Sequence, residues 1–100
     1  MEQIDNIITI EKLQRYFDVT KRAKQKVFDL NTQNIQTDEQ LADVYDMIER
    51  YYSDAQHFFS KNDYINAFAA LNYAHGWLDC IARLKLVDVG GDSVLFTVDE

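Results

Sequence analysis

Apolar side chains recur every three or four residues along most of this 100-residue chain, which is the spacing of amphipathic helices. The first such stretch covers about residues 10–30 and the second about residues 38–61. The third covers about residues 63–86 and follows a short break at Lys61-Asn62-Asp63, where Asp63 suits the N-cap of a helix. The pattern predicts three helices, and the short break makes the last two antiparallel neighbours.

The segment between the first two helices, Asn31–Thr37, is polar and rich in turn-forming residues, so we predict a loop there. Thr37 and Gln40 have the spacing of a capping box, and Asp38 and Glu39 suit the positive end of a helix. We therefore predict Thr37 as the N-cap of the second helix.

The apolar faces of the three helices should meet in one core. The predicted fold is all-α, a three-helix up-down-up bundle over residues 1–86 with a short C-terminal extension over residues 87–100. The predicted core residues are Leu13, Phe17, Val27, Leu41, Val44, Ile48, Ala55, Phe59, Phe68, Leu71 and Leu78.

The C-terminal extension differs in character from the helices. Gly90-Gly91 would end a helix, and Val94–Val98 is rich in strand-forming residues. Because one strand alone cannot form a sheet, the extension either packs on the bundle, pairs with another chain, or is a mobile tail.

Composition and charge narrow the classes of function. The absence of proline favours long helices, and a net charge of −7 argues against nucleic-acid binding. The single cysteine, Cys80, cannot form an internal disulfide, which fits a cytoplasmic protein. The N-terminus lacks the basic region of a signal peptide, and no apolar run approaches the roughly 20 residues of a membrane helix.

The second and third helices carry a distinctive set of residues: Tyr52, Asp54-Ala55, Phe58, Asp63-Tyr64, Ala67, Ala70, Tyr73-Ala74-His75-Gly76, Leu78-Asp79 and Arg83-Leu84. This set resembles the archaeal family catalogued as domain of unknown function 357. The resemblance is best over residues 41–86 and most specific in YAHGWLDC, and it does not extend to the tail. It implies a small helical bundle of the archaeal cytoplasm with no agreed ligand or reaction.

The third helix has a second apolar side besides its core face. Tyr73, Trp77, Cys80 and Leu84 gather there, which predicts a candidate interaction surface for a protein partner or a homodimer, with Tyr73 and Trp77 as anchors. The alternative is that the tail or the N-terminal residues fold over this side.

His75, Asp79 and Arg83 are spaced four apart and form a candidate polar ladder on the same helix. Such a set could serve acid–base chemistry or anchor a ligand, but a structural ladder at the rim of the core is the favoured interpretation.

Two features of the sequence point to an alternative role, an association with RNA. Lys12, Arg15, Arg22 and Lys26 form a basic stripe on the first helix, although pairing with the acidic second helix explains it better. The spacing of Arg50 and His57 resembles the Arg–His motif of the HEPN ribonucleases, which are also helical bundles.

These observations predict a non-enzymatic protein-interaction or self-assembly module without a cofactor or a metal ion. Asp54 and His57 would need further ligands to hold a metal, and the chain has no phosphate-binding glycine loop. The alternatives are an RNA-associated protein and a small-ligand pocket lined by the aromatic residues of the second and third helices.

Overall fold

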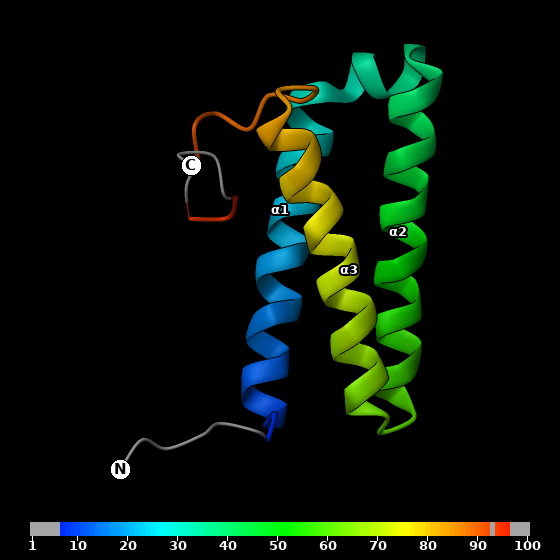
Figure 1. Ribbon diagram of the computed structural model, residues 1–100, viewed down its shortest axis with the longest axis vertical. Helices are drawn as coiled ribbons and strands as arrows, with labels where there is room; N and C mark the ends of the chain where they lie inside the picture. Colours follow the sequence, from blue (N-terminus) through cyan, green and yellow to red (C-terminus); the bar gives the residue numbers. More distant parts are fainter. Residues whose placement is uncertain (1–6, 93, 97–100) are drawn as a thin grey trace.

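The fold is an all-α bundle of three helices, as the sequence predicts. The computed structural model describes residues 7–92 and 94–96. The helices are α1 (Ile10–Thr37), α2 (Glu39–Ser60) and α3 (Tyr64–Arg83), and no strand occurs among the described residues. The chain runs up α1, down α2 and up α3 (Figure 1), which confirms the up-down-up topology.

Each helix begins at a side chain that satisfies free backbone N–H groups. Thr9 caps α1 and Asp63 caps α3, the latter as predicted. The prediction of Thr37 as the cap of α2 is wrong, because the Asp38 carboxylate accepts from the backbone N–H groups of Gln40 and Leu41. The Thr37 hydroxyl instead donates to a backbone carbonyl in the last turn of α1.

The ends of α2 and α3 are set by two residues with left-handed backbone, Asn62 (φ 62°) and Lys85 (φ 60°). In both places the next N–H reaches back to a carbonyl five residues earlier, as in a Schellman motif. The prediction that the third helix continues to about residue 86 is therefore wrong, and its last residue is Arg83.

The predicted loop over Asn31–Thr37 is also wrong, because this segment is helical and belongs to α1. The helix changes direction at Asn31, whose backbone is non-helical (φ −134°, ψ 22°), and the last turns cross towards the start of α2 (Figure 1). Asn31 is buried, and its amide donates to the carbonyls of Val27 and Asp88 at 2.9 and 2.8 Å. Burial of Ile35 in the core holds the segment after the kink.

The core lies between the three helices and agrees largely with the predicted residues. Leu13, Val27, Leu41, Ile48, Ala55, Leu71 and Leu78 are buried. The other four predicted core residues are only partly buried but pack against the core, and they are Phe17, Val44, Phe59 and Phe68.

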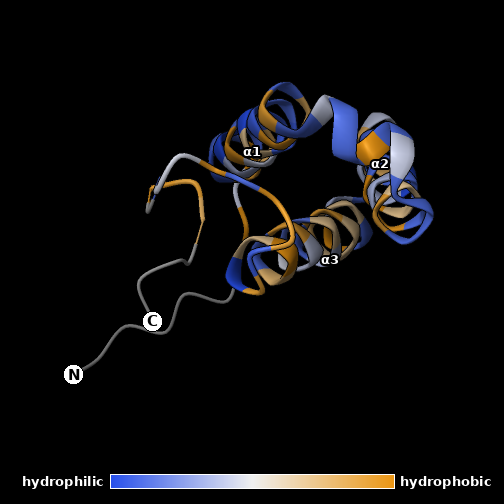
Figure 2. Cartoon of the chain, turned by 90° about the horizontal axis from the view of Figure 1, so that it is seen from above, coloured by the Kyte–Doolittle hydropathy of each residue, from blue (hydrophilic) through white to orange (hydrophobic). Residues whose placement is uncertain are grey.

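The described part of the C-terminal extension packs on the bundle. It lies beside α1 and α3, on the side away from α2 (Figures 1 and 2), and buries Val87, Val89, Leu95 and Phe96. Residues 94–96 form a turn, so the strand-like interpretation is wrong there, while Thr97 and Val98 lie outside the described residues. The described part of the extension therefore contributes to the core.

Polar contacts fix the extension at two points of α1. The side-chain carbonyl oxygen of Asn31 accepts a hydrogen bond from the backbone N–H of Asp88 at 2.8 Å. Together with the bond that the Asn31 amide donates to the Asp88 carbonyl, it makes a reciprocal pair of hydrogen bonds. The Lys26 ammonium meets the Asp92 carboxylate at 2.7 Å. The hydrogen bond from Lys26, helped by the backbone N–H of Leu95, lowers the pKa of Asp92 to about 2.

Candidate functional site

The candidate interaction residues of α3 lie on one side of the helix and form a row with the aromatic ring of Tyr51 on α2. The Tyr73 ring lies 4.5 Å from the Tyr51 ring and 6.5 Å from the Trp77 ring, measured between centroids. Tyr73 is 49% exposed and Leu84 63%, whereas Trp77 is partly buried against the core. We call Tyr51, Tyr73, Trp77, Cys80 and Leu84 the aromatic surface.

Sequence reasoning missed Tyr51 as a member of this surface. It directly precedes the core residue Tyr52 and lies about 100° from it on α2, so its ring faces α3 at the rim of the core. The aromatic stack therefore bridges two helices, and the surface belongs to the α2/α3 side of the bundle.

The alternative interpretation, in which the tail folds over the aromatic surface, does not hold for the described part of the tail. Its polar contacts are with α1 and with His75, and it lies on the side of the bundle away from α2 (Figure 2). Ile7 and Ile8 lie near Tyr16 and Phe68, at the other end of α3 from Leu84. Residues 1–6 lie outside the described part of the chain.

The polar ladder is centred on His75, which joins three parts of the fold. Its Nε2 lies 3.0 Å from the Leu95 carbonyl oxygen and its Nδ1 lies 3.0 Å from the hydroxyl of Thr20, a buried residue of α1. Because a carbonyl can only accept, Nε2 carries the proton, and in the neutral ring Nδ1 accepts from Thr20. Asp79 follows at 3.8 Å from Nε2, and Arg83 is exposed in the last turn.

This arrangement gives His75 a structural task, since both ring nitrogens are engaged between α1, α3 and the tail. The sequence could not reveal Thr20 or Leu95 as partners, because they lie 55 and 20 residues away.

The basic stripe of α1 is partly occupied by contacts within the chain. Arg22 lies 3.6 Å from the Asp18 carboxylate, and Lys26 holds the tail through Asp92. Arg15 is exposed, and Lys12 borders a cavity at the end of the bundle.

The pairing of a basic first helix with an acidic second helix occurs at Lys24, which lies outside the predicted stripe. Its ammonium meets Glu49 of α2 at 2.8 Å and lies 4.3 Å from the centre of the Tyr52 ring. The Lys24 side chain is only 12% exposed. Burial, followed by the nearby Asp18 and Glu49 carboxylates, raises the pKa of Tyr52, and burial with Glu49 raises that of Tyr45 beyond its usual range.

Arg50 and His57 both lie on the exposed surface of α2. Arg50 is exposed and pairs with Asp46 one turn away at 2.9 Å. His57 is exposed in the last turn of α2, beside the Phe58 ring. Within residues 7–92 and 94–96, no group of three or more metal-ligating side chains comes together, at Asp54 and His57 or elsewhere.

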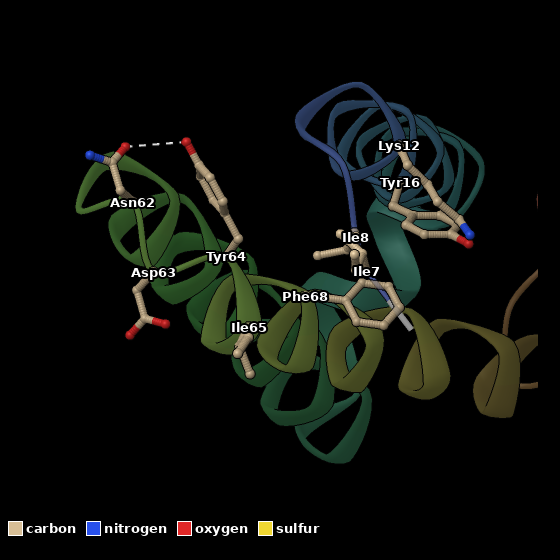
Figure 3. Close-up of a pocket in the computed structure, with 9 residues that line it drawn as sticks. All are labelled: Ile7, Ile8, Lys12, Tyr16, Asn62, Asp63, Tyr64, Ile65 and Phe68. Atoms are coloured by element: carbon tan, nitrogen blue, oxygen red, sulfur yellow. Dashed lines mark hydrogen bonds between the residues drawn. The ribbon is translucent and has the colours of Figure 1, made fainter. Parts of the chain in front are cut away.

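A cavity of about 770 Å³ opens at the end of the bundle where α1 and α3 begin. Ile7, Ile8, Tyr16 and Phe68 provide its apolar wall, and the Tyr16 and Phe68 rings lie 5.2 Å apart (Figure 3). Tyr64 stands at the opposite side and donates to Asn62 at 3.2 Å (Figure 3). The aromatic lining comes from α1 and α3, whereas the sequence suggested helices two and three.

A second cavity of about 410 Å³ lies between the start of α2 and the end of α3. Leu41, Val44, Ile81 and Leu86 line it, and Asp43 stands at its border. It extends the apolar α2/α3 side beyond Leu84. Among the described helices, none is long and apolar enough to cross a membrane.

Comparison with known proteins gives a family but no function. No curated protein and no solved structure gives a significant match to the chain. One family, described as a protein of unknown function (DUF357), matches residues 15–87. The match includes most of α1, whereas the resemblance in the sequence is best over residues 41–86, and it ends where the tail begins. The chain therefore belongs to the DUF357 family of proteins of unknown function.

Proposed function

We propose that this protein is a non-enzymatic protein-interaction module of the archaeal cytoplasm, and that the aromatic surface on α2 and α3 is where it binds another chain. One observation carries the proposal: the Tyr51, Tyr73 and Trp77 rings form a continuous row in which Tyr73 is 49% exposed and the other two are partly buried, while the described part of the tail packs elsewhere. Tyrosine and tryptophan anchors of this kind dominate the binding energy of protein interfaces.

The polar groups of the chain support an interaction role rather than catalysis. His75 is engaged by Thr20 and Leu95, and His57 is exposed on the surface of α2. A general acid or base needs a cleft in which a substrate can reach it. The basic stripe, with Arg22 and Lys26 paired, also gives less support to an RNA-associated role.

The cavity at the end of the bundle supports a second candidate function, the binding of a small apolar ligand. Its volume falls within the usual range of ligand pockets, and its wall is mainly apolar and aromatic. A hydrophobic dye displaced by ligand from the wild type but not bound by a Phe68→Glu variant would support this candidate.

Cys80 offers a direct test of the interaction surface, because it is the only cysteine and its thiol is exposed there. A photo-crosslinker is attached to Cys80 and activated in extracts that contain candidate partners. The matched control carries Cys80→Ser with Ile65→Cys, which places the same label at an 80% exposed position about four turns away, at the other end of α3.

We expect covalent adducts from Cys80 that are absent or much weaker from position 65. Identical adducts from both positions would contradict the proposal, because the label would then be reporting chance encounters. The mass of the adduct tells whether the partner is a second copy or a different protein.

A further inference from the structure

Basic and acidic residues are concentrated on different helices. This distribution of charge affects which kind of partner can bind to the aromatic surface. Six of the ten basic residues lie on α1. On α2 and its cap, acidic residues outnumber the single arginine, Arg50, and they are Asp38, Glu39, Asp43, Asp46, Glu49 and Asp54. Helix α2 is therefore strongly acidic, whereas α1 is basic.

Two of these carboxylates stand beside the aromatic surface. Asp54 is one turn after Tyr51 and Asp43 two turns before it, so both lie on the same side of α2 as the Tyr51 ring. Glu49 faces α1, where it pairs with Lys24, and Asp46 pairs with Arg50. Both Asp43 and Asp54 are exposed, and neither has an ion-pair partner among the described residues.

The apolar part of this side is long enough to hold a short partner helix. From Tyr73 to Leu84 the surface follows α3 for about three turns, roughly 16 Å at 1.5 Å per residue. The cavity between Val44, Ile81 and Leu86 continues it towards the start of α2, with Asp43 at the border. Amphipathic helices bind through their apolar face to apolar surfaces of their partners.

A second copy of the chain fits this surface poorly. A two-fold dimer through the aromatic surface would bring the Asp43 and Asp54 carboxylates of both chains to the same interface. With a net charge of −7 on each chain, the approach would also be opposed at long range. The nearby cations are Arg83 and Lys85 at one end, and Arg50, which lies one turn from Asp54 and pairs with Asp46.

Resting on the proposed function, we propose that the partner is a basic amphipathic helix of another protein. Its apolar side chains would lie on Tyr73, Trp77 and Leu84, and its lysine or arginine side chains would face Asp43 and Asp54. Charge complementarity would speed the encounter and select against acidic partners, while the aromatic anchors would supply most of the affinity.

The test uses two synthetic helical peptides of about 18 residues, or five turns. One repeats leucine and lysine with an amphipathic spacing, and the other has glutamate in place of lysine. Trp77 is the only tryptophan, so its fluorescence reports binding at the surface directly. We expect a saturable blue shift with the lysine peptide and none with the glutamate peptide.

Three variants separate the contributions of apolar contact and of charge to the binding of the peptide. Leu84→Ser keeps the charge and should weaken binding about tenfold, because an anchor is lost. Asp43→Asn with Asp54→Asn should weaken binding about tenfold at low salt and reduce its salt dependence. The matched control, Glu11→Gln with Asp29→Asn, makes the same charge change on α1 and should leave the affinity within about twofold.

Equal binding of both peptides, equal weakening by the α1 control, or no binding of the lysine peptide would overturn the inference. Its failure is distinguishable from failure of the proposed function. Adducts of Cys80 with a second copy or an acidic protein would keep the aromatic surface as a docking site and reject the basic partner. Identical adducts from positions 80 and 65 would reject both.

Discussion

Replacement of Asn31 by alanine should weaken the attachment of the tail to α1 without removing any apolar core residue. Asn31 is only 4% exposed, and its side chain exchanges two hydrogen bonds with the backbone of Asp88, both at 2.8 Å. A third bond, at 2.9 Å, holds the Val27 carbonyl at the kink. The variant removes all three bonds and leaves three backbone groups to find other partners.

The expected loss in the free energy of unfolding is about 2 kcal/mol. Each hydrogen bond contributes about 0.5–1.5 kcal/mol net, so the two bonds to Asp88 together account for about 1–3 kcal/mol. Asp88 is exposed, so water can satisfy its backbone groups in the variant, which keeps the loss away from the larger cost of buried unsatisfied groups. The Val27 carbonyl can regain a backbone partner if the helix straightens.

Urea unfolding followed by circular dichroism gives the loss, and hydrogen exchange of residues 87–96 shows where it arises. Asn34→Ala is the matched control, because Asn34 is an exposed asparagine one turn further along α1. We expect faster exchange in the tail for the Asn31 variant only. A loss within about 0.5 kcal/mol of the control would refute the role of Asn31 in holding the tail.

Leu71→Ala should lower the free energy of unfolding, measured by chemical denaturation, by about 2–5 kcal/mol because Leu71 is 1% exposed. A decrease of less than about 1 kcal/mol would contradict its place in the core. The pKa of Asp92 is lowered from 3.8 to about 2, so the Lys26 contact stabilises the fold fully above about pH 4 and is lost as the pH falls towards 2. Thermal unfolding should show Asp92→Asn less stable than wild type at pH 6 but nearly equal to it near pH 2, and a constant difference would refute the linkage. His75→Ala should speed hydrogen exchange at Leu95 and leave the start of α3 unchanged, whereas unchanged exchange at Leu95 would contradict the bond between them.

The fold was predictable because its main determinants are local. The spacing of apolar residues sets the three helices, and the short turn at Asn62 forces the last two to run antiparallel. The predicted side of α3 that carries Tyr73 and Trp77 follows from the same helical periodicity, so the structure places these side chains together.

The segment after Asn31 could not be predicted, because its conformation depends on distant partners. Its polar composition is that of a loop, but Asp88 satisfies Asn31 from 57 residues away and the core buries Ile35. The place of the tail depends likewise on His75, whose partners are far from it in sequence. Long-range contacts of this kind leave no periodic pattern in the chain.

The choice of cap at the start of α2 failed for a different reason. Thr37 and Asp38 are both good N-caps, and the helix starts at the second because the first still belongs to α1. Local propensity alone does not separate two adjacent candidates.

Binding of partners to the α2/α3 side can be mapped by the changes in amide chemical shift during titration with the lysine peptide. We expect the largest shifts at Tyr51, Tyr73, Trp77 and Leu84, with little change along α1. Shifts centred on the tail, on Lys12 and Tyr16, or spread evenly over the molecule would contradict binding at the α2/α3 side.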